Sequence, residues 1–128
     1  MNILLWILQI ILGLFFTLVG IMHFIVPPGL PAQMAWMYDL SPTLHYISGT
    51  AEILGGLGLI LPSVFRIKTW LTPLAALGLT LVMILATIYH LQRGEPMNII
   101  LNLVWAVLLA FVAYGRWKIV PLSDRSSS

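Results

Sequence analysis

Residues 46–61 read YISGTAEILGGLGLIL, an apolar run interrupted by one carboxyl group, that of Glu52. The whole chain has 128 residues, of which 60% are hydrophobic and 8% are charged, whereas an average soluble domain carries about 25% charged residues. This composition indicates a membrane protein, so the run is expected to lie in a bilayer. A charged side chain at that depth costs roughly 2.5–3.5 kcal/mol on insertion scales. Glu52 is therefore the first candidate for a functional residue.

Four stretches are apolar enough to cross a bilayer, which takes about 20 residues of helix. They lie at residues 3–26, 44–61, 70–91 and 97–117. Proline or glycine stands at their boundaries, and Pro62 is expected to end the second stretch. The sequence predicts an all-α integral membrane protein with a four-helix transmembrane domain at residues 1–119. A short polar cytoplasmic tail is predicted at residues 120–128.

The distribution of basic residues predicts an orientation. Four spans place both termini and the loop between the second and third spans on one side. That side carries five of the six basic residues, namely Arg66, Lys68, Arg116, Lys118 and Arg125, and the other side carries Arg93. The positive-inside rule therefore predicts a multi-pass protein of a bacterial-type inner membrane with both termini in the cytoplasm. The basic residues form no nucleic-acid patch, so the expected partners are the lipid bilayer and other membrane proteins.

The connection at residues 27–43, here called the cap segment, is longer than most connections between helices. It is also apolar and aromatic, with Trp36 and Tyr38 among its residues. Aromatic rings of this kind gather at the membrane interface, so the segment is expected to lie there and to cover the outer end of the bundle. Two interpretations of the cap segment stay open at this point: an interfacial anchor, or a lid over a ligand pocket.

Polar side chains within the spans gather in the outer half of the predicted bundle, because successive helices run in opposite directions. They are His23, His45, Glu52, His90, Asn98 and Asn102. On each helix these residues fall on one face at spacings of three or four residues. The pattern predicts a polar pocket that opens toward the cap segment. The inner half is expected to hold almost nothing polar beyond Gln9.

Glu52 and His23 are the leading ligand-binding candidates, followed by His90 and Asn102. Each also has a structural interpretation, as a neutral carboxyl group, an interfacial histidine or an amide that bonds a neighbouring helix. His45 lies at the outer mouth, where an exposed structural role is expected. Two histidines and one carboxylate can hold a metal ion, but three ligands on three helices without a local motif do not predict a metal site. No catalytic residue is assigned.

The glycine-rich run at residues 55–58 could be mistaken for a nucleotide-binding loop. It lacks the strand–loop–helix setting that phosphate binding needs. Small residues in an apolar helix let two backbones approach closely. Packing against a neighbouring helix is therefore the role expected of Gly55, Gly56 and Gly58.

Several segments together resemble the DoxX-like family of small four-span membrane proteins. They are the run from Gly20 to Phe24, the run from Gly49 through Glu52 to Pro62, the run from Tyr89 through His90 to Glu95, and Asn98 with Asn102 and the residues Ala113 to Arg116. The resemblance covers roughly residues 3–116. It implies a four-helix membrane bundle in which the matched polar positions are His23, Glu52, His90 and Asn102.

The resemblance also implies a class of function. Relatives include membrane subunits of a thiosulfate:quinone oxidoreductase and components of membrane oxidoreductase complexes. This chain has no cysteine, so the thiol chemistry of any relative does not transfer to it. The favoured hypothesis is a small subunit of a membrane redox or electron-transfer assembly with an outer-leaflet pocket for a quinone-like or lipid ligand. The alternative is a non-catalytic structural or chaperone-like membrane partner that stabilises a larger complex.

Overall fold

The computed structural model describes residues 1–125, which form an all-α fold. Its long helices are α1 (Asn2–Phe24), α3 (Pro42–Phe65), α4 (Leu71–Arg93) and α5 (Pro96–Tyr114), and α5 continues into a π-helical turn, η2 (Gly115–Ile119). Each is long and apolar enough to cross a membrane when η2 is counted with α5. The predicted four-helix transmembrane bundle is confirmed. Residues 126–128 of the predicted tail lie outside the described residues.

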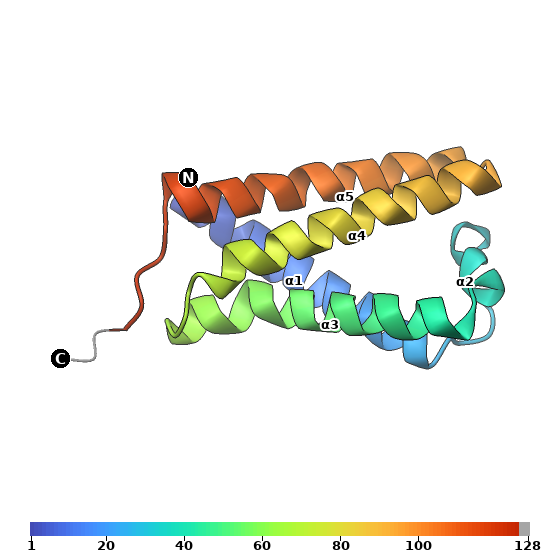
Figure 1. Cartoon of the computed structure of the whole chain (residues 1–128), viewed down its shortest axis with the longest axis horizontal. Coiled ribbons are helices and arrows are strands. Elements are labelled where there is room, and N and C mark those ends of the chain that lie inside the picture. Colours follow the sequence, from blue (N-terminus) through green and yellow to red (C-terminus); the bar gives the residue numbers. More distant parts are fainter. Residues whose placement is uncertain (126–128) are drawn as a thin grey trace.

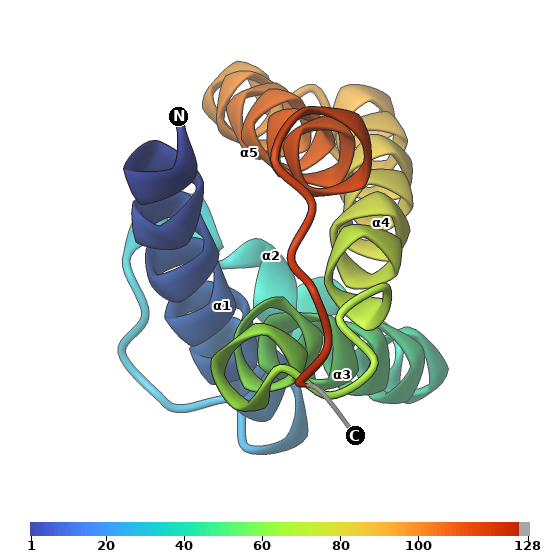
Figure 2. The ribbon, with the colours of Figure 1, turned by 90° about the vertical axis from the view of Figure 1, so that its left-hand side faces the viewer.

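The four long helices lie side by side, with the N-terminus and the last described residues at one end of the bundle (Figure 1). The cap segment forms a 3-10 turn, η1 (Ala32–Met34), and a short helix, α2 (Trp36–Asp39), at the opposite end. We call these the termini end and the cap end. Seen along its axis, the bundle pairs α1 with α3 and α5 with α4 (Figure 2). Contacts between α3 and α4 join the two pairs.

The close pairing of α1 and α3 depends on glycines that face each other in two places. A Cβ atom on Gly20 would lie 2.9 Å from the carbonyl oxygen of Gly49, and one on Gly49 would lie 2.9 Å from that of Gly20. Gly13 and Gly56 face each other in the same way, with corresponding distances of 2.9 and 2.7 Å. Inside a membrane no hydrophobic force drives helices together, so this close backbone contact is a main source of packing energy.

The prediction that the second span ends at Pro62 is wrong, because α3 continues to Phe65. A proline inside a helix has no N–H to donate, which leaves the carbonyl group four residues earlier without its helical partner. Here that carbonyl group belongs to Gly58, and the hydroxyl group of Thr72 on α4 donates to it at 3.0 Å. A side chain from the next helix thus supplies the hydrogen bond that Pro62 removes.

The inner half of the bundle is more polar than the sequence indicates, so that expectation is also wrong. Gln9 donates to the carbonyl oxygen of Leu59 at 2.8 Å and to the Ser63 hydroxyl group at 3.0 Å. The Ser63 hydroxyl group in turn lies 2.7 Å from that of Thr72. Arg116, at the end of the fourth predicted span, is buried and donates to the side-chain oxygen of Gln9. These contacts tie all four long helices together near the termini end.

The start of the predicted tail folds back onto the loop between α3 and α4. The carboxylate of Asp124 accepts hydrogen bonds from the Thr69 amide at 2.8 Å and from the Thr69 hydroxyl group at 2.7 Å. These bonds hold the pKa of Asp124 below its ordinary value. Arg66 also donates to the carbonyl oxygen of Ser123 at 3.0 Å. The tail therefore packs against the bundle up to the last described residue.

Replacing Gly49 by alanine tests the helix contact. The added methyl group would meet the Gly20 carbonyl oxygen and the His23 Cβ at 2.9 Å, and overpacking of this kind costs typically 1–3 kcal/mol. We expect Gly49→Ala to lower the free energy of unfolding in detergent by about that amount. Gly78→Ala is the matched control, since no atom lies within 4 Å of its added methyl group. Equal stability of the two variants would contradict the proposed contact.

A labelling experiment tests the orientation. The chain has no cysteine, so a single introduced cysteine reports without background. Gln33→Cys places the thiol in the cap segment, and Ser123→Cys places it at the termini end. In intact cells we expect a membrane-impermeant maleimide to label the first and not the second. The reverse pattern would show that the cap segment is on the cytoplasmic side, opposite to the side that the basic residues predict.

Candidate functional site

A cavity of about 440 Å³ lies in the cap-end half of the bundle. Its walls come from all four long helices and from the cap segment. All four sequence-predicted ligand-binding residues line it: His23, Glu52, His90 and Asn102. Asn98 lines it as well, and most of the remaining lining side chains are apolar. The structure therefore brings the predicted residues together at one cavity, as their positions along the helices indicated.

Glu52 and His23 form a buried pair across the α1–α3 contact. Glu52 Oε2 lies 3.1 Å from His23 Nε2, and each residue exposes 4% of its surface. The two atoms are close but not aligned as a hydrogen bond, and Oε2 has no other polar partner among the described residues. The pair is held in place by the neighbouring contact between Gly20 and Gly49, because a methyl group on Gly49 would strike the Cβ of His23.

His45 is buried and contacts His23, contrary to the expectation that it would be exposed. It exposes 9% of its surface. Its Nδ1 lies 2.8 Å from His23 Nδ1, and its Nε2 lies 2.7 Å from the carbonyl oxygen of Met37 in α2. The spacing of His45 and Glu52 on one face of α3 was visible in the sequence. The contact between His45 and His23 was not, because it depends on how α1 and α3 are rotated against each other.

His90 is buried at the opposite wall and is bonded to the loop between α4 and α5. Its Nδ1–H donates to the Glu95 carboxylate at 2.8 Å, and Arg93 donates to the same oxygen at 3.0 Å. These contacts hold the pKa of Glu95 below its ordinary value, with the bond from His90 as the largest cause. Arg93 also donates to Asp39 of α2 at 2.8 Å. These hydrogen bonds among His90, Arg93, Glu95 and Asp39 therefore connect the cap segment to the α4–α5 loop.

Trp36 of the cap segment lies between the two histidine-bearing walls. Its ring centroid is 5.0 Å from that of His90 and 6.0 Å from that of His23, and it lines the cavity. Tyr38 stabilises the fold of the cap segment, since its hydroxyl group donates to Pro27 at 2.6 Å and accepts from Leu30. This arrangement is what the lid interpretation requires. That the cap segment lies in the membrane interface stays a prediction.

The described residues contain no group of three or more histidine, cysteine, aspartate or glutamate side chains arranged to hold a metal ion. The polar side chains that line the cavity can donate and accept hydrogen bonds and exchange protons. The titratable side chains that line it include the carboxyl group of Glu52 and the imidazole rings of His23 and His90, which belong to α3, α1 and α4 respectively.

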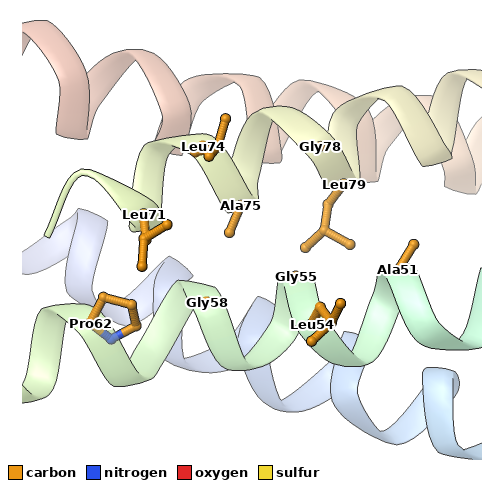
Figure 3. Close-up of a pocket in the computed structure, with 10 residues that line it drawn as sticks. All are labelled: Ala51, Leu54, Gly55, Gly58, Pro62, Leu71, Leu74, Ala75, Gly78 and Leu79. Atoms are coloured by element: carbon orange, nitrogen blue, oxygen red, sulfur yellow. The ribbon is translucent and has the colours of Figure 1, made fainter. Parts of the chain in front are cut away.

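A second hollow, of about 320 Å³, lies between α3 and α4 nearer the termini end. Figure 3 shows the residues that line it, which are aliphatic side chains, glycines and Pro62. Leu71 and Leu79 reach into the space between the two helices, and Ala51 lies at the opposite end of the hollow from Pro62 (Figure 3). None of the lining residues carries a titratable group. The hollow is therefore an apolar groove without chemistry of its own.

The fold and the cavity define a class: a four-helix membrane bundle with a buried polar site under a cap segment. The chain belongs to the DoxX-like family, whose model matches residues 7–112. The match includes the four predicted site residues together with His45 and Glu95. No curated protein and no solved structure matches the chain.

The bonds around Glu95 predict a pH dependence. A carboxyl group whose pKa is lowered by folding stabilises the folded state above its ordinary pKa, and that stabilisation is lost as the pH falls through the lowered value. We expect the thermal stability of the wild-type protein to fall in that acid range. Glu95→Gln should be less stable at neutral pH and should lose less stability on acidification. Parallel losses in the two proteins would contradict this role for Glu95.

Proposed function

We propose that this DoxX-like protein is a small subunit of a membrane redox or electron-transfer assembly and that its cap-end cavity holds a quinone-like molecule. The observation that carries the proposal is the buried Glu52–His23 pair in the wall of an apolar cavity. Ligand sites are typically apolar clefts of roughly 300–1,000 Å³ with a few converging polar groups. A cavity of about 440 Å³ lies within that range.

The polar groups of the cavity favour a neutral ligand. No lysine or arginine belongs to the described residues that line it, whereas an anionic lipid headgroup is usually bound by such cations. A quinone carries no charge and presents carbonyl oxygens that accept hydrogen bonds. Glu52, paired with His23, can donate to one such oxygen, and His90 and Asn102 line the same cavity. Aromatic rings at the walls, including Trp36 and Trp105, suit a flat ring system.

The location that we propose with this function is a bacterial-type inner membrane with both termini in the cytoplasm. The support is the placement of the basic residues at the two ends of the bundle. Arg66, Lys68, Arg116 and Lys118 lie at the termini end, and Arg93 lies at the cap end. In that orientation the cavity is in the outer half of the membrane, and its ligand is exchanged with the outer leaflet.

A structural or chaperone-like role is the second candidate, and the groove between α3 and α4 favours it (Figure 3). Gly55, Gly58, Ala75 and Gly78 line this groove, and small residues let another helix approach closely. Under this hypothesis the cavity groups serve stability alone. A variant of the groove, such as Gly78→Leu, would then disrupt assembly with partner proteins, and a cavity variant would leave assembly intact.

Quinone binding can be measured directly in lipid nanodiscs. The probe is a decyl benzoquinone, which quenches tryptophan fluorescence, and Trp36 and Trp105 line the cavity. We expect saturable quenching in the wild-type protein. Glu52→Gln should bind the quinone about tenfold more weakly, because an amide is a poorer hydrogen-bond donor than a carboxylic acid. A tenfold loss of affinity corresponds to about 1.4 kcal/mol of binding free energy. The control variant Asp124→Asn makes the same carboxyl-to-amide change at the termini end, and it should bind the quinone as the wild-type protein does.

Two results would contradict the proposal. One is the absence of saturable quenching in the wild-type protein. The other is equal affinity in Glu52→Gln and the wild type. Native mass spectrometry of the gently solubilised protein gives an independent measurement, since co-purifying quinone that is lost in Glu52→Gln supports the cavity as its site. Stoichiometric partner proteins together with bulk lipid alone would favour the structural role.

A further inference from the structure

Three side chains form a continuous chain of polar contacts from the cap segment to the cavity. The carbonyl oxygen of Met37 lies 2.7 Å from His45 Nε2, and His45 Nδ1 lies 2.8 Å from His23 Nδ1. His23 Nε2 then lies 3.1 Å from Glu52 Oε2. All three titratable residues are at least nine-tenths buried. Every nitrogen of both rings therefore faces an identified atom, and the protons can be assigned from the partners.

The proton positions follow from the carbonyl oxygen of Met37, which can only accept a hydrogen bond. A backbone carbonyl oxygen has no proton, so His45 Nε2 must donate to Met37. In a neutral imidazole ring one nitrogen donates and the other accepts, which makes His45 Nδ1 an acceptor. His23 Nδ1 must then carry the proton between the two rings. By the same rule His23 Nε2, which faces Glu52, has no proton of its own while the ring is neutral.

The buried environment fixes the charge of the remaining pair. An uncompensated charge in an apolar site is very costly, so the pair is stable when its net charge is zero. That condition allows one proton between His23 Nε2 and Glu52 Oε2, which belongs either to a neutral carboxyl group or to an imidazolium facing a carboxylate. Moving a proton further, onto His45, would separate opposite charges by the width of the His23 ring. The pair therefore holds a single proton at the cavity wall.

We infer that His45 is a positioning residue that fixes the tautomer of His23, so that the Glu52–His23 pair presents one proton donor and one acceptor side by side to the cavity. The inference rests on the proposed function for the identity of the ligand. A carbonyl oxygen can accept the proton of Glu52. A hydroxyl group can accept that proton and donate to His23 Nε2. The site therefore suits both the carbonyl and the hydroxyl form of a quinone-like ring without a change in its net charge.

Without His45, His23 Nδ1 has no acceptor, and Glu52 is the remaining polar partner of the ring. The ring proton is then expected on Nε2, where it can be donated to Glu52, so that two protons would lie between the facing Nε2 and Oε2 atoms where one lies now. Glutamine at position 45 offers a rescue. Its amide oxygen can accept from His23 Nδ1 and its amide nitrogen can donate to Met37, as His45 does. Leucine at position 45 can do neither.

The experiment is nitrogen NMR of the full-length protein in nanodiscs with ¹⁵N-labelled histidine, assigned by single substitutions. A protonated ring nitrogen and an unprotonated one have well-separated shifts, so each tautomer is read directly. We expect wild-type His23 to be protonated at Nδ1 and His45 at Nε2, with a coupling between the two Nδ1 atoms across their hydrogen bond. His45→Gln should keep the proton on His23 Nδ1. His45→Leu should move it to Nε2.

Two outcomes would overturn the inference. One is a wild-type His23 that is protonated at Nε2 and not at Nδ1, which needs no variant and is independent of whether His45→Leu folds. The other is an unchanged His23 tautomer in a folded His45→Leu protein. These spectra require no ligand, so they test the tautomer of His23 independently of whether the protein binds a quinone.

Binding of the decyl benzoquinone tests the functional consequence. We expect affinity at least about tenfold weaker in His45→Leu, the loss of one hydrogen bond of about 1.4 kcal/mol, and near wild-type affinity in His45→Gln. If the tautomer shifts as expected and the wild-type protein binds no quinone, the proposed function fails and the role of His45 in fixing the tautomer stands. If quinone binds and both variants bind it equally, the functional part of the inference is overturned.

Discussion

The close contact between the backbones of α1 and α3 determines the geometry of the cavity. Where Gly20 meets Gly49, the two helices approach until a single added methyl group would strike a carbonyl oxygen. Because α1 and α3 run in opposite directions, His23 and Glu52 lie one turn from this contact on opposite sides of it, and their side chains reach toward each other across it to within 3.1 Å. A wider separation of the helices would leave the carboxyl group without a partner in an apolar environment, where it would be far more costly.

The buried polar groups at the two ends of the bundle differ in their hydrogen-bond partners. Near the termini end, Gln9, Ser63 and Thr72 bond to one another and to backbone carbonyl groups, so their bonding capacity is used within the protein. At the cap end, Glu52 Oε2 has a close neighbour but no aligned hydrogen bond. The termini end also has a buried atom without a hydrogen-bond partner in the described part of the chain, Nη2 of Arg116, so the cap end is the candidate for ligand binding because Glu52 lines a cavity there.

The fold could be predicted from the sequence because four apolar stretches of spanning length leave few alternatives. The candidate residues could be predicted too, since Glu52 and His23 are ionisable groups inside apolar helices. The contact of His45 with His23 could not, because it depends on the rotation of α1 against α3. The continuation of α3 past Pro62 could not be predicted either, since it depends on Thr72 of another helix. The burial of Arg116 similarly depends on Gln9, more than a hundred residues earlier.

The partners of Arg116 have a consequence for how the protein is made. Its guanidinium group donates to Gln9 and Asn2 of α1, at the opposite end of the chain. During synthesis α1 is inserted first and α5 last, so this cation has no acceptors on α1 until the fourth span has entered the bilayer and met the first. The contacts between α1 and the end of the fourth span therefore form only after that span has been made. A chain that stalls before α5 leaves the Gln9 amide oxygen buried without its cation.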